Sequence, residues 1–425
     1  MEIYVVQQGD TIDIIAQKFG VSPEKLMKDN QINMPDLLII GQALVVAYPE
    51  QVYTVQEGDS LAGIAEAFDV TVLQLLRNNP DLANRQYIYP GEILVISYDN
   101  DNGSVWVVGY TYPFIKDNIL RMTLPYLTYL LIYNYRVTAD GELTGGDEDI
   151  DIIQTAALYD TPSTLVLTTY SQSGEISLEV EYEVLLDAQL QDKILEELLN
   201  ILRSKNYSGV NLAYQDINKS NQQLYINFLK RAWDSFHSEG FGVFLTLNPG
   251  LYYDGTEVTF EQLNLEEISE YCDGILFMSY DWGYIVRAPL QFSIVTTPSL
   301  LEYIVSQVPL SKIRIVLPTL GYDWKLPFVA GQSRANALNY DSVIELARQT
   351  GSTILYDENT LSAYFEYTGN NGQQHIVWFK DARSIDSAIK ILQTYGIIGV
   401  GIWNIMYYFA QLWLVINTQY DIVKV

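Results

Sequence analysis

The sequence is poor in the side chains that form cross-links and transition-metal sites. Its 425 residues include one cysteine, Cys272, and two histidines, His237 and His375. A single cysteine excludes an internal disulfide framework. Neither histidine stands at a metal-ligand spacing from another ligand, so we expect no metal site and no cofactor.

Basic residues and long apolar runs are also scarce. The chain has 24 Lys and Arg against 52 Asp and Glu, a formal net charge of −28. Such a charge repels phosphates, so we expect no nucleic-acid partner and no anionic membrane surface. No apolar run approaches the roughly 18 residues of a spanning helix, so we expect no membrane insertion. Residues 1–4 begin a strand-like stretch without the features of a signal peptide, and we expect synthesis in the cytoplasm.

Tyrosine and apolar residues, in contrast, are abundant. There are 33 tyrosines, and 48% of the residues are hydrophobic. This composition allows sizeable cores in more than one domain. Tyrosine suits wet, amphipathic contact surfaces, including surfaces that bind carbohydrate.

The first hundred residues contain a duplicated segment. Residues 4–11 (YVVQQGDT) recur as residues 53–60 (YTVQEGDS), with an offset of 49 from Gly9 to Gly58 and 50 from Gly41 to Gly91. Each copy has the pattern strand, helix, helix, strand. Thr11 and Ser60 are placed to cap the first helix of each copy.

Both copies resemble the LysM domain over nearly their full length, residues 1–48 and 51–98. The resemblance implies binding of N-acetylglucosamine units of peptidoglycan or chitin, in a groove between the loop after the first strand and the loop before the last. The positions that the resemblance assigns to this groove are Gly9, Asp10, Thr11, Ile39 and Ile40 in the first copy, and Gly58, Asp59, Ser60, Tyr89 and Pro90 in the second. Asp10 and Asp59 also fit the alternative of plain turn and capping residues. Tandem modules gain avidity on a polymer that offers many sites.

A polar linker at residues 99–104 separates this part from an alternation of buried-strand and helical patterns. The expected strands are residues 105–110, 129–135, 164–169, 209–214, 242–247, 274–279, 313–318 and 398–403. Eight such strands within residues 105–425 predict an α/β fold, a (β/α)₈ TIM barrel. Three further strand patterns, at residues 353–357, 363–368 and 373–379, predict a small α+β insertion at about residues 321–380.

The end of the fourth expected strand carries the most informative motif. Residues 207–217 (YSGVNLAYQDI) resemble the signature Asp-x-x-Asp-x-Asp-x-Glu of glycoside hydrolase family 18, with Ser208, Asn211, Ala213 and Gln215 at the four signature positions. Residues 277–284, 317–327 and 377–384 are similar to stretches of spore cortex-lytic N-acetylglucosaminidases of endospore formers. Those enzymes also carry two N-terminal LysM modules, so the resemblance covers the whole chain.

The resemblance implies a retaining, substrate-assisted mechanism. A glutamic acid protonates the glycosidic oxygen, and an aspartate two residues earlier on the same strand face orients the substrate's acetamido group. Gln215 has no ionisable proton, and Ala213 has no carboxylate. Since general acid catalysis contributes roughly 10²–10⁴-fold, the sequence predicts that no catalytic residue is intact.

The resemblance also implies a glycan-binding floor in the barrel. Its positions fall on Asn211, Tyr280, Asp281 and Trp403. The alternative for Tyr280, Asp281 and Trp403 is ordinary packing at the barrel rim.

These observations lead to three functional hypotheses. The first is a non-hydrolytic protein of the spore coat, cortex or cell envelope that binds peptidoglycan-type or chitin-type glycans. The second is an N-acetylglucosaminidase that degrades cortex peptidoglycan, either with a relocated acid or in an engineered inactive form. The third is a structural coat protein whose acidic, tyrosine-rich surface contacts other copies or other spore proteins.

Overall fold

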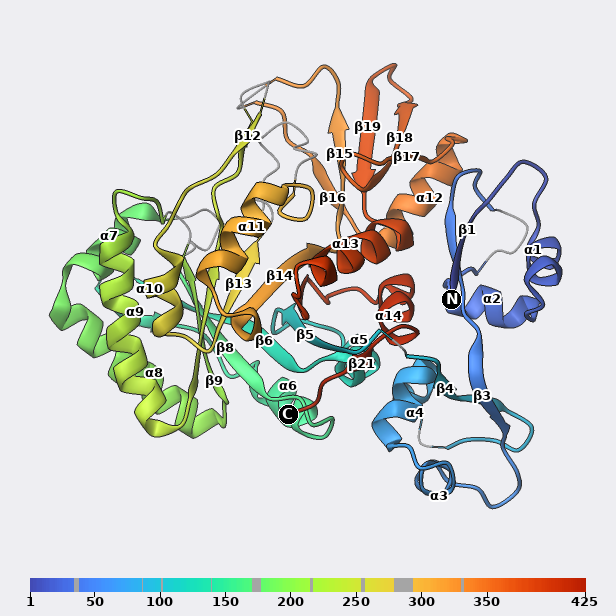
Figure 1. Cartoon of the computed structure of the whole chain (residues 1–425), viewed down its shortest axis with the longest axis horizontal. Coiled ribbons are helices and arrows are strands. Elements are labelled where there is room, and N and C mark those ends of the chain that lie inside the picture. Colours follow the sequence, from blue (N-terminus) through green and yellow to red (C-terminus); the bar gives the residue numbers. More distant parts are fainter. Residues whose placement is uncertain are drawn as a thin grey trace.

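The computed structural model describes the chain except residues 34–37, 86, 101, 139, 170–176, 215–216, 254–256, 279–292 and 330–331, and the side chains of residues 214, 252 and 253. Two small modules precede a barrel that carries a five-stranded insertion (Figure 1). No helix within the described ranges is long and apolar enough to cross a bilayer.

Each module consists of two helices and a two-stranded antiparallel sheet, as the repeat predicts. The first module comprises β1 (Glu2–Val5), α1 (Ile12–Phe19), α2 (Pro23–Asp29) and β2 (Ala43–Val46). The second comprises β3 (Pro49–Thr54), α3 (Leu61–Ala67), α4 (Val72–Asn78), the 3-10 helix η1 (Pro80–Asn84) and β4 (Ile93–Tyr98). The hydroxyls of Thr11 and Ser60 accept hydrogen bonds from backbone N–H groups in the first turns of α1 and α3, so both predicted caps are confirmed.

The barrel is a closed sheet of eight parallel strands, which confirms the predicted fold class. Its strands are β5 (Ser104–Thr111), β6 (Tyr129–Val137), β8 (Ser163–Thr168), β9 (Gly209–Tyr214), β10 (Gly242–Leu247), β13 (Gly274–Met278), β14 (Ile313–Pro318) and β20 (Gly399–Trp403). They lie in chain order around the sheet, and pairing of β5 with both β20 and β6 closes the ring. Short strands flank the barrel sheet, namely β7 (Leu143–Thr144) beside β6 and β21 (Asp421–Ile422) beside β5.

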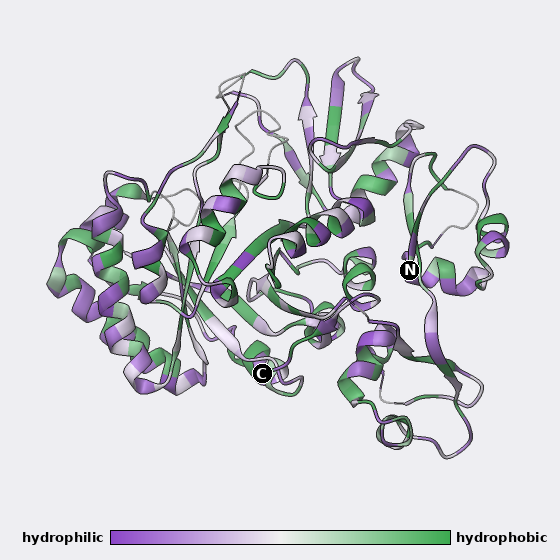
Figure 2. Ribbon diagram, viewed as in Figure 1, coloured by the Kyte–Doolittle hydropathy of each residue, from purple (hydrophilic) through white to green (hydrophobic). Residues whose placement is uncertain are grey.

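Helices, most of them amphipathic, cover the outside of the barrel. They are α5 (Asp117–Thr123), α6 (Ile150–Ala157), α7 (Leu178–Leu186), α8 (Ala188–Lys205), α9 (Gln222–Phe236), α10 (Leu265–Glu270), α11 (Pro298–Gln307), α13 (Ala382–Thr394) and α14 (Ala410–Asn417). Figure 2 shows hydrophobic barrel strands, and helices whose hydrophobic and hydrophilic residues fall on different sides. This is the arrangement that a 3.6-residue apolar period produces in helices packed on a sheet.

The insertion between β14 and β20 is a five-stranded antiparallel sheet packed on α12 (Tyr340–Thr350). Its strand order is β16 (Asn336–Leu338), β15 (Gly321–Lys325), β19 (Gln374–Phe379), β18 (Ser362–Thr368) and β17 (Leu355–Asp357). The sequence predicted β17, β18 and β19 and missed β15 and β16. β15 is five residues long and β16 is three residues long, and neither was recognised from the sequence.

The two modules contact the barrel through different elements (Figure 1). The first module uses its last strand, where the Gln411 side-chain amide of α14 donates to the Ala43 carbonyl oxygen at 2.7 Å. The second module uses α4, where the Tyr126 hydroxyl donates to the Arg77 carbonyl oxygen at 2.6 Å. The copies are therefore alike in fold and different in surroundings.

Candidate functional site

The candidate site in the barrel is built on β9, which lies between β8 and β10 in the barrel wall. Val210 and Leu212 pack outward in the large core beneath the helices. Ala213 belongs instead to the separate cluster of side chains inside the barrel, and Asn211 reaches the same interior. Asn211 and Ala213 therefore share one strand face, as their two-residue spacing predicts.

Asn211 is fully buried in a chain of polar groups that crosses the barrel interior. Its side-chain oxygen accepts a hydrogen bond from the Thr246 hydroxyl at 2.9 Å, and the Thr246 oxygen lies 2.5 Å from the Tyr110 hydroxyl oxygen. The Asn211 amide nitrogen has no hydrogen-bond partner among the described residues. A carboxylate at position 213 would provide an acceptor on that face, whereas the methyl group of Ala213 provides none.

Trp403 ends β20 and is 7% exposed. Its ring meets those of Tyr110, Tyr112 and Tyr133 edge-on, with centroids 5.2, 6.1 and 5.6 Å away. The Trp403 carbonyl oxygen accepts from the Thr319 backbone N–H at 3.0 Å, and the peptide bond to the next residue is cis. The structure thus brings Trp403, Asn211 and Ala213 into one barrel interior.

The remaining predicted barrel positions lie outside the described residues. These are Gln215 at the acid position and Tyr280 and Asp281 of the expected binding floor.

The two histidines contact neighbouring side chains by hydrogen bonding or ring stacking. The His375 Nδ1 atom lies 2.8 Å from the Asp323 carboxylate in the insertion, and the Tyr367 hydroxyl donates to the same carboxylate at 2.9 Å. The His237 ring stacks on Trp233 at a centroid distance of 3.9 Å. No group of three or more potential metal ligands occurs in the described part of the chain.

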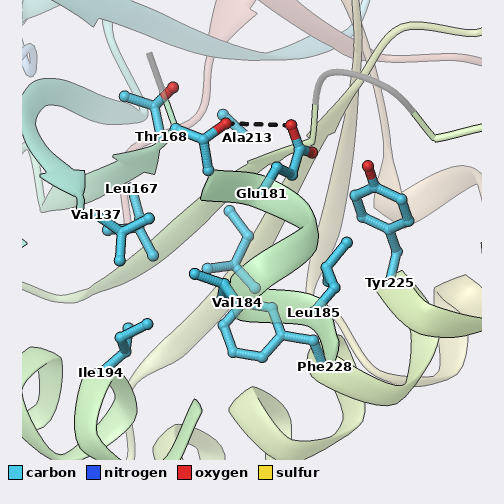
Figure 3. Close-up of a pocket in the computed structure, with 12 residues that line it drawn as sticks. Val137, Leu167, Thr168, Glu181, Val184, Leu185, Ile194, Ala213, Tyr225 and Phe228 are labelled. Atoms are coloured by element: carbon cyan, nitrogen blue, oxygen red, sulfur yellow. Dashed lines mark hydrogen bonds between the residues drawn. The ribbon is translucent and has the colours of Figure 1, made fainter. Parts of the chain in front are cut away.

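A buried carboxylate that the sequence analysis did not single out lies beside β9. Glu181 of α7 is 4% exposed and accepts a hydrogen bond from the Thr169 hydroxyl at 3.1 Å. It lines a small cavity of about 30 Å³ together with Ala213 and mainly apolar side chains. Figure 3 shows Glu181 pointing toward the end of the cavity where Ala213 lies. Little in the sequence distinguishes Glu181, because Glu179, Glu181 and Glu183 alternate along α7 and only the middle one is buried.

The loops after the first strands of the modules are nearly identical. The Asp10 carboxylate accepts from the Gln7 backbone N–H and the Tyr4 hydroxyl, both at 2.7 Å. Asp59 repeats these two contacts with the equivalent residues, at 2.7 and 2.8 Å. Both carboxylates thus fix the turns in which Gly9 and Gly58 have positive φ. This geometry favours the turn interpretation for the two aspartates.

The loops before the last strands differ between the modules. In the first module Ile39 is 6% exposed and Ile40 is 43% exposed. In the second module Tyr89 is 58% exposed, and Pro90 and Gly91 are also exposed. The two predicted grooves are therefore unequal in access.

Comparison with known proteins places both parts of the chain. Residues 107–407 match the model of glycosyl hydrolases family 18, and residues 4–47 and 53–97 match that of the LysM domain. The chain is 32% identical over 437 residues to the cortical fragment-lytic enzyme of Bacillus anthracis, covering 100% of this chain and 99% of that protein. It is 30% identical over 438 residues to the enzyme of the same name from Bacillus subtilis, with the same coverage. Among solved structures, it is similar to the Bacillus cereus spore cortex-lytic enzyme SleL, with a TM-score of 0.78, 30% identity and coverage of 100% and 99%.

Proposed function

The chain belongs to family 18 of the glycosyl hydrolases, and on that premise we propose that it binds an N-acetylglucosamine-containing glycan of the spore without cleaving it. Relatives that align along the full chain are named cortical fragment-lytic enzymes, so we assign cortex peptidoglycan as the glycan. Chitin contains the same N-acetylglucosamine unit and is the alternative glycan. This assignment places the protein in the spore coat or cortex, or elsewhere in the cell envelope.

The observation that carries the proposal is the side chain at position 213. Ala213 lies on the interior face of β9, where the family signature has the carboxylate that orients the acetamido group. A methyl group cannot stabilise the positive charge of the oxazolinium intermediate, and losing one such electrostatic contact costs on the order of 10²–10³-fold in rate. The sequence adds Gln215 at the acid position, whose amide has no ionisable proton.

Retained binding in the barrel is proposed for Trp403, with Asn211, Tyr280 and Asp281. Trp403 lies at the carboxyl end of its strand, where ligand sites of (β/α)₈ barrels are found. Of the tyrosine rings around it, Tyr110 and Tyr133 are buried and Tyr112 is half-buried. A few sugar–aromatic contacts with two or three hydrogen bonds correspond to weak binding, with Kd in the millimolar to high-micromolar range.

Hydrolysis assays test the proposal directly. We expect no product release from cortex fragments or N-acetylglucosamine oligomers above a buffer blank at any pH between about 4 and 8, because the proton donor is absent. The double variant Ala213→Asp with Gln215→Glu, with each single variant as control, tests whether these two carboxylates are the only groups that the chain lacks for hydrolysis. Turnover by the wild-type chain, measured as released reducing ends, would contradict the proposal.

Glu181 is the described carboxylate to test for the second candidate function, an enzyme with a relocated acid, although most of the side chains around it belong to the core beneath the helices. It is a buried carboxylate that lines the same cavity as Ala213. If the wild-type chain does hydrolyse glycan, Glu181→Gln should lower turnover by about 10²–10⁴-fold. Glu179→Gln, on the exposed side of the same helix, is the matched control and should leave turnover unchanged.

A further inference from the structure

We propose that the second LysM module is the glycan-binding module of the intact chain and that the first has a structural role, fixed to the barrel domain. We call the loop before the last strand of each module its lip, residues 39–41 and residues 89–91. The assignment rests on the glycan binding proposed above. It follows from what each lip contacts.

The lip of the first module is bonded to the barrel domain. The Ile354 backbone N–H donates to the Ile40 carbonyl oxygen at 2.9 Å, and the Arg383 guanidinium donates to the Gly41 carbonyl oxygen at 3.3 Å. A Cβ atom on Gly41 would come within 1.8 Å of the Ile354 carbonyl oxygen. This part of the lip therefore faces protein at van der Waals distance and has no space for a sugar.

The strand that follows this lip is also part of the interface. All four residues of β2 are buried: Leu44 and Val46 lie in the module's own core, whereas Ala43 and Val45, together with Ile39, belong to the same hydrophobic core as the barrel. The Gln411 side-chain amide donates to the Asn30 side-chain oxygen at 3.1 Å as well as to the Ala43 carbonyl oxygen. The first module is thus held by shared apolar core and by hydrogen bonds, as domains in a permanent contact are.

The lip of the second module has none of these contacts among the described residues. Tyr89 is 58% exposed where its counterpart Ile39 is 6% exposed, and Ile93 is 68% exposed where its counterpart Ala43 is 1% exposed. A Cβ atom on Gly91 would meet no described atom within 4 Å. Like the first module it has a core of its own, and it contacts the barrel domain through α4 and through Val95 and Tyr98 of β4, which pack against Leu414.

The exposed lip is an ordered surface rather than a loose loop. The Glu92 carboxylate accepts from the Tyr89 backbone N–H at 3.2 Å and from the Arg85 guanidinium at 2.6 Å. Tyr87, 70% exposed, lies close in sequence to this anchored turn. Tyr87 and Tyr89 are mostly exposed, and exposed tyrosine is the kind of amphipathic side chain that stacks on a sugar ring and hydrogen-bonds its hydroxyls.

Hydrogen–deuterium exchange of the full chain with and without an N-acetylglucosamine tetramer tests the assignment. We expect slower exchange in peptides that cover residues 87–93 and unchanged exchange in peptides that cover residues 38–43. Protection confined to residues 38–43, or equal at both lips, would overturn the assignment. No protection in either lip, together with no retention on insoluble peptidoglycan, would overturn the proposed glycan binding and the assignment with it.

A pair of variants distinguishes specific glycan binding from nonspecific adsorption. In the full chain, Tyr89→Ser should reduce retention on insoluble peptidoglycan by at least about ten-fold, because a central aromatic contact is removed. Tyr48→Ser removes an exposed tyrosine outside both lips and is the matched control. Retention that is unchanged by Tyr89→Ser, or lowered equally by both substitutions, would overturn the assignment.

Discussion

At the scale of single residues, Asp149 is a buried charge with well-defined partners. It is fully buried, and its carboxylate accepts from the Lys205 ammonium at 2.8 Å and from the Tyr207 hydroxyl at 2.5 Å. Burial alone would raise the pKa of this carboxyl, but hydrogen bonds from Lys205, Tyr207 and Asn134 outweigh it and hold the pKa below its usual value. The ionised form therefore stabilises the folded chain.

We expect Asp149→Asn to lower the free energy of unfolding by about 3 kcal/mol at pH 7, since it leaves the Lys205 charge without its buried partner. Because the folded-state pKa is depressed, this stabilisation is present above the ordinary aspartate pKa of about 4 and is lost as pH falls through the folded value. Urea unfolding of both proteins from pH 7 to pH 3 should show a constant difference that narrows below about pH 4. A difference that is independent of pH would contradict the role of the charge.

Single residues also mark where prediction from the sequence succeeds and where it stops. The motif placed Ala213 and Trp403 at the carboxyl ends of strands, and both lie in the interior cluster. The partner of Asn211 could not be predicted, because Thr246 belongs to another strand and only the register of β9 and β10 brings them together. Glu181 was missed because its burial depends on how α7 packs against the barrel.

At the scale of elements, Gly41 and Gly91 form a matched pair. Both have φ near +90°, but only Gly41 lies against the barrel domain. We expect Gly91→Ala to destabilise the chain by about 1–2 kcal/mol through left-handed backbone strain alone. Gly41→Ala should cost more, because the added methyl group also collides with the Ile354 carbonyl group.

Thermal unfolding and limited proteolysis measure the difference in stability between the Gly41→Ala and Gly91→Ala chains. The Gly41→Ala chain should melt several degrees below the Gly91→Ala chain, and its first module should be cleaved faster. Equal melting temperatures would mean that the docked lip contributes nothing to stability.

The elements themselves were well predicted from the sequence, whereas their contacts were not. Every barrel strand begins and ends within two residues of its expected position, because buried parallel strands are continuous apolar runs. The repeat predicted two modules of the same fold. The replacement of Ala43 by Ile93 and of Ile39 by Tyr89 was visible in the sequence, but only the structure shows which lip faces the barrel.

At the scale of the whole molecule, the first module acts as part of the barrel domain. We expect a chain that starts at residue 49 to melt several degrees lower than the full chain and to bind a hydrophobic dye. The physical reason is that removal of β2 exposes apolar surface of α13 and α14 that it covers in the intact chain. Calorimetry and dye fluorescence measure the two effects. A shortened chain with the melting temperature of the full chain would contradict the structural role of the first module.

Because β2 docks on residues near the end of the chain, this docking can occur only late in protein synthesis. Ala43 and the side chain that bonds to it, Gln411, are 368 residues apart in sequence. At a translation rate of 5–20 residues per second, the first module leaves the ribosome about 20–70 s before its docking surface exists. In the second module the lip is open, but Val95 and Tyr98 of the last strand also pack against Leu414 of α14. The barrel-facing side chains of β2, Ala43 and Val45, therefore stay uncovered for most of protein synthesis, whereas Leu44 and Val46 are already buried in the module's own core.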